Sequence, residues 1–332
     1  MARVRFDILL FAAIALTGGL VSAHPATAEE AAAAAGTATA APAALPMPSA
    51  VLTAMVADQS SSTSSSASGD QGGGGGYFAN WTKRVDATQA EQPHWMTPVV
   101  TVTPRLEEEV RYDQLWQSRP NQADLTNFGS NKGLELIPAE PIEIIVGIPG
   151  YETLSTPKGT KEGWADESFL IKYRAVTANE ENGNYILTGF LGVSVPTGDP
   201  AFTNAFTIWT PTIAGGKGWG TRTEGFDIQS TLAMSFPGGN EKVLGEPLVW
   251  NTAFQGHILS ERFWPEVEVQ YTHFHDGPND GRSQTVLTFG AIAGRFPITG
   301  RLRLAIGGGY EQAVGGFHTF NHAWVLTLRT PF

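Results

Sequence analysis

The stretch His322-Ala-Trp-Val-Leu-Thr-Leu-Arg-Thr-Pro-Phe332 decides the fold that we predict for this chain. One parity of this stretch is apolar, while the other includes Thr327 and Arg329; the apolar positions are Trp324, Leu326, Leu328 and Phe332. A strand of about ten residues with one apolar face crosses a bilayer at a tilt, and a terminal aromatic residue suits the membrane interface. The same pattern also fits a buried edge strand of a soluble sheet. The rest of the chain must therefore decide between a transmembrane barrel and a soluble fold.

The amino-terminal residues predict export. Arg3 and Arg5 precede an apolar run from residue 8 to residue 21, and Val21-Ser-Ala23 follows as a cleavage site. This order is typical of a secretory signal peptide, with cleavage after Ala23 or, as the second choice, after Ala28. We therefore expect a signal peptide at residues 1–23 and a location in the cell outer membrane.

Charge and cysteine content exclude several classes of function. Removal of residues 1–23 takes two of the 21 basic residues and one of the 32 acidic residues, so the mature chain carries a net charge of −12. Such a chain has no global cationic surface for nucleic acid. The absence of cysteine excludes disulfides, thiolate catalysis and cysteine-bound zinc. No later run of eighteen apolar residues predicts a transmembrane helix.

Composition divides the mature chain into three parts. Residues 24–76 contain an alanine-rich run, a serine-rich run and five consecutive glycines. Because such a segment buries little apolar surface, we expect a disordered tether there. Residues 77–100 include Trp81 and Trp95 without clear periodicity, and they fit either a short plug or a periplasmic cap. We assign residues 101–332 to the barrel.

Residues 102–332 repeat a period-two pattern that predicts β-strands. In residues 226–236, for example, Phe226, Ile228 and Leu232 alternate with Asp227 and Gln229. We expect about twelve strands, at 102–115, 125–137, 141–149, 166–176, 184–195, 205–216, 226–237, 248–258, 263–274, 284–296, 301–312 and 322–332. The ranges 125–137 and 205–216 have the weakest pattern, and loss of one hairpin would leave ten strands.

Strand length and connection length favour a membrane barrel over a soluble β-sandwich. The runs extend for roughly nine to twelve residues, whereas strands of soluble proteins average about five or six. An even strand number suits a bacterial barrel with both termini in the periplasm. Short connections at 138–140, 259–262 and 297–300 then fall on the periplasmic side, and longer polar ones at 150–165, 238–247 and 275–283 fall outside.

Motifs for catalysis or metal binding are weak. His273 and His275 lie on one face of a strand, with Asp276 next to them, but no third ligand is evident, so we interpret them as a polar cluster at the rim. The run Gly215-Gly-Lys-Gly-Trp-Gly220 lacks the spacing of a phosphate-binding loop and predicts a glycine-rich turn. No Gly-x-Ser-x-Gly motif is present. We therefore predict neither enzyme activity nor a cofactor nor a bound metal.

Charged residues on the inward parity are the better functional candidates. Both signs occur on neighbouring predicted strands, so these residues either line a narrow wet path or neutralise one another in a filled lumen. The candidate lumen-lining residues are Arg105, Glu107, Glu109, Arg111, Lys172, Arg174, Glu266, Glu268, Arg301, Arg303 and Glu311. Mixed charge predicts weak ion selectivity. Trp209, Trp219, Trp250 and Trp264 fit either solute contacts or, for most of them, an interfacial girdle.

Four segments carry a resemblance to a known family. Val100–Asp113, Gly133–Pro149, Leu191–Gly198 and Phe317–Trp324 resemble the outer-membrane family named after the meta-pathway of phenol degradation. The resemblance covers about residues 100–332, and the segments around Pro138 resemble an early hairpin of that family. It implies a transporter-like barrel that takes up aromatic or other hydrophobic compounds, and it transfers no site residue.

Together these features predict an all-β, antiparallel outer-membrane barrel behind an N-terminal tether. The expected function is passive uptake of small aromatic or hydrophobic solutes, with outer-membrane lipid and the solute as partners. A non-conducting structural or interaction barrel and a soluble exported β-sandwich that binds ligands remain the alternatives. The oligomeric state is left open.

Overall fold

The structure of the chain is a computed structural model that describes residues 77–332, apart from residues 79, 131, 258 and 259. The predicted signal peptide and the predicted tether at residues 24–76 lie outside the described residues. Within the described part of the chain, no helix combines the length and the apolar character needed to cross a bilayer.

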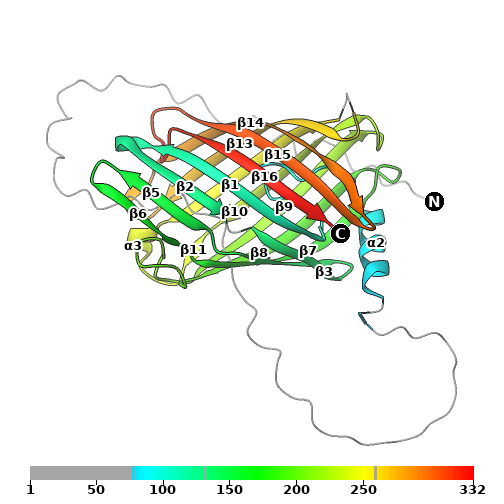
Figure 1. The fold of residues 1–332 in the computed structure, drawn as a ribbon, viewed down its shortest axis with the longest axis horizontal. Coiled ribbons are helices and arrows are strands. Elements are labelled where there is room, and N and C mark those ends of the chain that lie inside the picture. The colour runs from blue at the N-terminus through cyan, green and yellow to red at the C-terminus, as the bar shows by residue number, and fades with distance from the viewer. Residues whose placement is uncertain (1–76, 79, 131, 258–259) are drawn as a thin grey trace, which may run out of the picture. The chain divides into compact units, whose positions relative to one another are not determined.

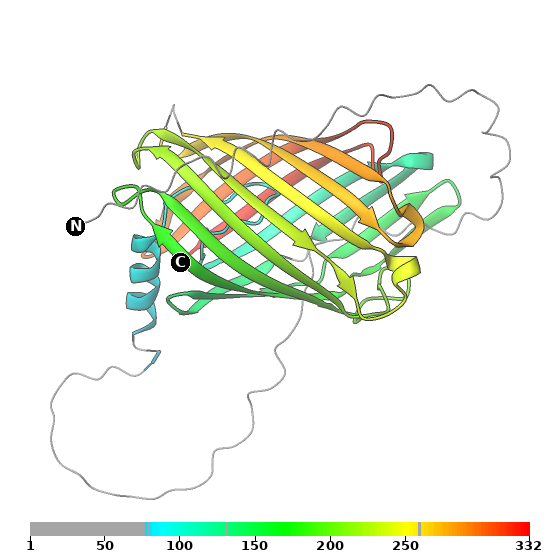
Figure 2. The same cartoon turned by 180° about the vertical axis from the view of Figure 1, so that it is seen from behind.

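The described strands form one closed barrel, shown from two sides in Figures 1 and 2. Sixteen strand segments are present, and eight of them combine in consecutive pairs, so the barrel has twelve strands. In chain order the barrel strands are β1 (Glu109–Arg119), β2 with β3 (Ala123–Gly129 and Gly133–Ala139), β4 with β5 (Ile142–Gly147 and Tyr151–Thr156), β6 with β7 (Gly159–Trp164 and Glu167–Ala178), β8 (Tyr185–Val195), β9 (Ile208–Gly220), β10 with β11 (Gly225–Met234 and Phe236–Pro237), β12 (Glu246–Gly256), β13 (Phe263–His275), β14 (Ser283–Thr299), β15 (Leu302–Val314) and β16 (His322–Pro331). The described helices are α2 (Trp81–Glu91) and the short α3 (Glu241–Leu244).

Pairing between the first and last strands closes the sheet. β1 and β16 are antiparallel over ten residue pairs, from Glu109 opposite Pro331 to Ser118 opposite His322. Because the sheet is closed, no free strand edge runs the full length of the wall. An antiparallel sheet needs this closure in lipid, where unpaired backbone groups have no water to bind. The prediction of an all-β antiparallel transmembrane barrel with about twelve strands is therefore confirmed, and the two weakest strand ranges both lie in the wall.

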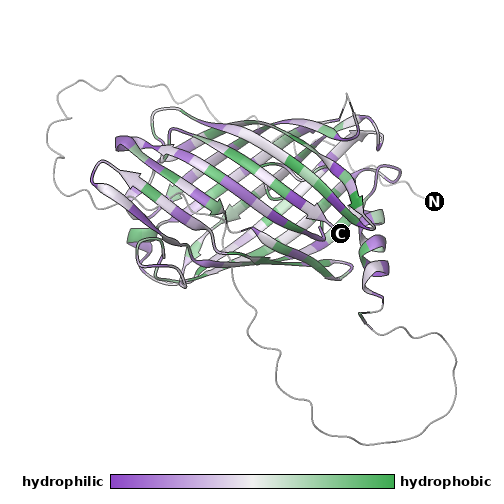
Figure 3. Cartoon of the chain, viewed as in Figure 1, coloured by the Kyte–Doolittle hydropathy of each residue, from purple (hydrophilic) through white to green (hydrophobic). Residues whose placement is uncertain are grey.

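The alternation in the sequence places apolar side chains outside and polar ones inside. Purple and green segments alternate along the strands in Figure 3. Aromatic and aliphatic residues that project outward include Tyr173, Ile213, Leu232, Phe289 and Trp324, each with 44–57% of its surface exposed. Their inward neighbours, such as Lys172 and Thr231, are buried. The exterior is thus a lipid-facing belt, and the polar residues belong to the lumen.

Two strand predictions were wrong in detail. The first wall strand begins at Glu109 instead of residue 102, because residues 101–108 leave the wall and run inside the barrel. Residues 150–165 were expected to form a loop, yet β5 and β6 make a hairpin there, from Tyr151 opposite Trp164 to Thr156 opposite Gly159. This hairpin lengthens the wall by continuing the pairing of β2 with β5.

The connections fall at two mouths, which we name after α2. At the α2 mouth they are residues 140–141, 179–184, 221–224, 257–262 and 300–301, and at the far mouth they are residues 120–122, 157–158, 196–207, 238–245, 276–282 and 315–321. The segment before β1 and the end of β16 both lie at the α2 mouth, as Figure 1 shows. The longest connections are at the far mouth, as an outer-membrane barrel requires of its external side.

Candidate functional site

Residues 92–108, which we call the inner segment, fill part of the lumen. They follow α2, which lies across one mouth of the barrel, and they lead into β1 (Figures 1 and 2). No residue of the inner segment belongs to a helix or strand, and all of them except His94 and Val100 are buried. The sequence left open whether this region is a plug or a cap. In the structure, α2 lies at the mouth and covers part of it, while the inner segment occupies the interior.

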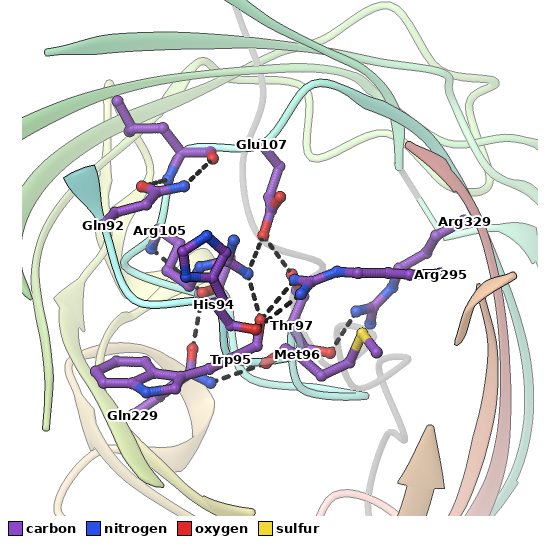
Figure 4. A network of polar contacts seen from close by, with 12 residues as sticks. Gln92, His94, Trp95, Met96, Thr97, Arg105, Glu107, Gln229, Arg295 and Arg329 are labelled. Carbon is purple, nitrogen blue, oxygen red and sulfur yellow. Dashed lines mark hydrogen bonds and ion pairs between the residues drawn. The ribbon is translucent and has the colours of Figure 1, made fainter. Parts of the chain in front are cut away.

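Three arginines of the wall donate hydrogen bonds to backbone carbonyl groups of the inner segment. Arg295 on β14 binds the oxygens of His94 and Trp95, both at 2.7 Å. Arg329 on β16 binds the oxygens of Thr97 and Pro98, and Arg111 on β1 binds that of Val99 at 2.8 Å. Figure 4 shows Arg295 and Arg329 reaching the segment from the wall. An extended backbone has no internal partners for these carbonyl groups, so the arginines supply them.

Two carboxylates of β13 satisfy the backbone N–H groups of the same stretch. Glu266 accepts a hydrogen bond from the Val99 nitrogen at 2.8 Å. Glu268 accepts bonds from the Val100 nitrogen at 2.7 Å and the Thr101 nitrogen at 2.6 Å, and it also accepts from the Thr101 hydroxyl. Charged partners make stronger hydrogen bonds than neutral ones. The inner segment is therefore held by charge on both its carbonyl and its amide side.

Neutral and cationic side chains from other strands complete the contacts. Gln229 on β10 donates to the Met96 oxygen at 2.9 Å, and Thr188 on β8 donates to the Pro104 oxygen at 2.6 Å. Lys172 on β7 donates to the Arg105 oxygen and pairs with Glu143 at 2.8 Å. Glu143 on β4 also accepts a hydrogen bond from the Glu107 nitrogen at 2.5 Å, so contacts come from at least eight of the described strands. Nearly all of these hydrogen bonds from the wall are made with backbone atoms of the segment and not with its side chains.

The predicted lumen residues occupy three kinds of position. Glu109, Arg111, Lys172, Arg174, Glu266, Glu268 and Glu311 are buried on wall strands, Arg303 lies on β15 at the α2 mouth, Arg105 and Glu107 belong to the inner segment, and Arg301 lies in a turn at that mouth. The structure therefore corrects the expected wall position of Arg105 and Glu107. These two residues form an ion pair at 2.6 Å within the segment instead.

Two other predicted residues hold α2 at the mouth. Arg301 donates to Asp86 of α2 at 2.7 Å, and Arg174 donates to the Thr88 oxygen at 2.8 Å and to Glu91 at 2.9 Å. The Arg301 side chain is partly exposed, because the turn between β14 and β15 projects beyond the wall. The expected lumenal position of Arg301 is therefore also corrected.

The glycine-rich run at 215–220 was expected to be a turn, and this prediction was wrong. These residues are the last part of β9, where Gly216 and Gly218 face inward. A Cβ atom on Gly216 would lie 2.5 Å from Cζ3 of Trp95, and one on Gly218 would lie 2.5 Å from Nε1 of Trp95. The glycines therefore make room for the largest side chain of the inner segment. Sequence reasoning missed this because the partner lies more than one hundred residues away.

His94 and Glu180 join the inner segment to the connection between β7 and β8. The His94 backbone nitrogen donates to Glu180 at 2.6 Å, and its Nδ1 lies 2.9 Å from the other carboxylate oxygen. Burial works against ionisation of Glu180, but the hydrogen bonds from the His94 side chain and backbone outweigh it and lower its pKa to about 2. This contact was not identified from the sequence, because neither residue follows a period-two pattern.

Two cavities flank the inner segment at the α2 mouth. One has a volume of about 420 Å³, and its lining includes Arg105, Arg222, Arg295, Arg301 and Arg303. The other has about 360 Å³ and lies between α2 and the connections at 179–184 and 221–224. At the far mouth, a smaller cavity of about 100 Å³ is lined by residues that include Phe274 and Phe320.

The histidines and tryptophans that drew attention in the sequence lie at different depths. His273 contacts Ser283 at 2.8 Å and lies against His275, and among the described residues no three His, Asp or Glu side chains are grouped to hold a metal ion. Trp209, Trp219 and Trp250 are exposed on the outer surface, as a girdle requires. Trp264 differs, because it is buried and stacks on His257 with ring centroids 4.0 Å apart.

Comparison with known proteins finds similar solved structures only. No family model matches the sequence, and no curated protein matches it. The chain is similar to an outer membrane channel of Pseudomonas putida F1, with 13% identity over 68% of this chain and 94% of that one and a TM-score of 0.46. It is also similar to the NanC porin (11% identity, 67% and 98% coverage, TM-score 0.41) and to a loop-deletion mutant of OmpT, an outer membrane protein of Vibrio cholerae (8%, 68% and 97%, 0.30). These scores are low, so the fold rests on this chain's own strand pairing.

Proposed function

We propose that the chain is an outer-membrane channel for the passive uptake of small solutes and that the inner segment is its removable plug. The observation that carries this proposal is the way in which the segment is held. Hydrogen bonds from polar and charged wall residues to backbone atoms fix it inside the lumen. Its release leaves those wall groups free to bind water, because arginine and carboxylate side chains are readily solvated.

The route of release is open at one end. The inner segment continues into α2, and α2 lies outside the strands at the mouth. Its ties there include Arg301 to Asp86, an ion pair with both partners more than 40% exposed. Exposed ion pairs contribute about 0–1 kcal/mol each, so this tie is weak compared with the buried contacts. Withdrawal through the α2 mouth requires no break in the β-sheet.

The lumen lining favours solutes that carry a polar group. Buried inward residues of the wall include Asp113, Thr188, Gln229, Asn251 and Glu311. Aliphatic compounds without polar groups gain little in such a path, whereas phenol-like compounds can replace part of the water at these groups. We therefore propose small polar and aromatic solutes as cargo, with no enzymatic step.

The test is solute flux into liposomes that contain the refolded barrel. Phenol-like aromatics are compared with sugars of similar size, for the natural chain and for an Arg105/Arg174/Arg303 alanine triple variant. Flux above that of empty liposomes, changed in the variant, supports passage through the lumen. Absence of flux from a correctly folded barrel, including one with a weakened plug, contradicts the proposal.

A non-conducting barrel is the second candidate, because the plug contacts are numerous and buried. In that case the inner segment is a permanent core, and its apolar cluster of Trp95, Met96 and Val99 with Trp264 and Ile292 holds the barrel together. Loss of the segment would then lower the stability of the whole barrel. A channel predicts instead that the segment leaves while the strands stay folded, which hydrogen exchange distinguishes.

A further inference from the structure

A cluster of arginines surrounds the 420 Å³ cavity at the α2 mouth. Its lining carries five guanidinium groups and only two acidic side chains, Asp86 and Glu107. Those carboxylates already pair with Arg301 at 2.7 Å and with Arg105 at 2.6 Å. The cavity therefore has an excess of positive charge in a chain whose net charge is −11.

Three of the five arginines have no carboxylate partner among the described residues. Arg295 binds only backbone oxygens of the inner segment. Arg303 donates to the backbone oxygens of Gly300 and Leu302, at 2.8 Å and 3.3 Å. Arg222 lies in the connection between β9 and β10 and lines both cavities at this mouth. In addition, the Nε atom of Arg105 is buried and has no hydrogen-bond partner within the described part of the chain.

The backbone is bent to bring Arg295 into this cluster. The register between β14 and β15 shifts at Arg295, which stands in a bulge between Gly294 and Phe296. Its φ of 59° lies in the left-handed region, which is unfavourable for a residue other than glycine. A bulge re-aims the side chain of its extra residue. Here the bulge directs the guanidinium group of Arg295 into the mouth. In a regular strand, the alternation of side chains would point this residue elsewhere.

Part of the remaining lining is apolar and suits a small organic group. Ala90, Pro331 and Phe332 also line the cavity. Its volume is within the range of small-molecule sites, about 300–1,000 Å³. Guanidinium groups bind carboxylates through two parallel hydrogen bonds, and an aromatic ring can pack on apolar neighbours such as Phe332.

We propose that this cavity is a binding site for small aromatic carboxylates. Arg222 and Arg303 supply the free positive charge, and Phe332 with its neighbours contacts the ring. Arg295 contributes to the positive field while it holds the inner segment. Binding does not require that the barrel conduct, so the site and the proposed channel function can fail separately.

Isothermal titration of the full-length, folded barrel in detergent tests the proposal. Benzoate is the probe, benzamide is its neutral counterpart, and inorganic phosphate is an anion without a ring. We expect benzoate to bind, with affinity that falls as salt is raised, and benzamide and phosphate to bind at least about ten-fold more weakly. Equal binding of benzamide, equal binding of phosphate, or no benzoate binding at low salt would each overturn the assignment.

Two glutamine variants and a matched control locate the site. Arg303→Gln and Arg222→Gln remove one charge each without touching any contact to the inner segment, and each should weaken benzoate binding roughly ten-fold. Arg262→Gln is the control, because Arg262 lies at the same mouth but outside the cavity lining. All variants are first checked for the heat-dependent gel shift of a folded barrel. An equal loss in Arg262→Gln, or no loss in either cavity variant, refutes the site.

Discussion

Substitution Glu268→Gln should release the inner segment while the barrel stays folded. The Glu268 carboxylate accepts three hydrogen bonds, from the Val100 nitrogen, the Thr101 nitrogen and the Thr101 hydroxyl. Glutamine has nearly the same shape but only one acceptor oxygen, and its NH₂ group would face at least one N–H donor. At least one bond is therefore lost, and the others change from charged to neutral.

The expected loss of free energy that holds the inner segment in place follows from the number of hydrogen bonds affected. A hydrogen bond to a charged group contributes about 1.5–3 kcal/mol and a neutral one about 0.5–1.5 kcal/mol. One lost bond and two weakened ones amount to roughly 3.5–6 kcal/mol, of which part is returned because a neutral amide costs less to bury. A net loss of about 2–4 kcal/mol raises the released fraction about 30-fold to several hundred-fold, at 1.4 kcal/mol per factor of ten.

The absence of cysteine provides a clean assay. Val99→Cys places a thiol at a position that is 1% exposed, so maleimide reacts only after the segment leaves. When the segment rebinds faster than it reacts, the labelling rate is proportional to the released fraction. Ser155→Cys, at an exposed position on β5, gives the rate for a free thiol.

Glu311→Gln is the matched control for the Glu268→Gln variant. Glu311 is a buried inward carboxylate on β15, and it makes no hydrogen bond with the inner segment among the described residues. Its substitution should leave the labelling rate of Cys at position 99 within a few-fold of the parent. Equal rates in the Glu268→Gln and Glu311→Gln backgrounds would refute the reasoning, because the carboxylate of Glu268 would then not hold the segment.

Three further predictions concern the packing of the segment, its acid sensitivity and the lipid belt. Gly216→Ala should displace Trp95 and raise the same labelling rate, whereas Gly215→Ala should not, since a Cβ atom there has ordinary space of 3.5 Å; equal effects would contradict the packing argument. The pKa of Glu180 is lowered to about 2, so its ionised carboxylate stabilises the folded state at pH values above its usual pKa of 4.5. This stabilisation is lost as pH falls from about 4.5 to 2. A nitroxide at Ala87→Cys on α2 should therefore become more mobile over that range, and in Glu180→Gln it should be mobile already above it; an unchanged spectrum in the variant would count against the contact. Phe289→Arg, on the outer face near the middle of β14, should cost about 2–4 kcal/mol in the free energy of unfolding from liposomes, while Thr160→Arg on the projecting hairpin should cost little, and similar values would argue against a lipid belt at Phe289.

The barrel wall was largely predictable because each strand carries its own information. Alternation at Phe226, Ile228 and Leu232 against Asp227 and Gln229 depends only on which face meets lipid. The same reasoning predicted β16, and its pairing with β1 then follows from closure. What alternation does not give is where a strand stops. The hairpin of β5 and β6 was missed because its tip, with Thr160 and Glu162, is exposed on both faces and has lost the apolar parity.

The first wall strand was placed too early for a different reason. Arg105, Glu107 and Glu109 keep a charged parity with Arg111 across the point where the chain turns from the lumen into the wall. Inside a polar barrel, a charged residue meets the same surroundings whether it stands on the wall or on a segment within it. Charge pattern alone therefore cannot separate the two positions, and only the strand pairing at Glu109 does.

The sequence did not show which residues form the plug, because the wall binds the plug through its backbone atoms. Arg295, Arg329, Glu266 and Glu268 bind backbone atoms, and every residue type presents a carbonyl group and, apart from proline, an N–H group. The side chains of residues 97–104 consequently need no pattern of their own, and only Trp95 leaves a trace, in the glycines of β9 that face it. The information that specifies the plug therefore lies in the wall, as buried charges with no partner on the neighbouring strand. Such buried charges are costly unless a segment inside the lumen binds them. The sequence of the wall strands alone can therefore indicate an internal segment. The signal is a larger number of inward arginine and glutamate residues than cross-strand ion pairs can use.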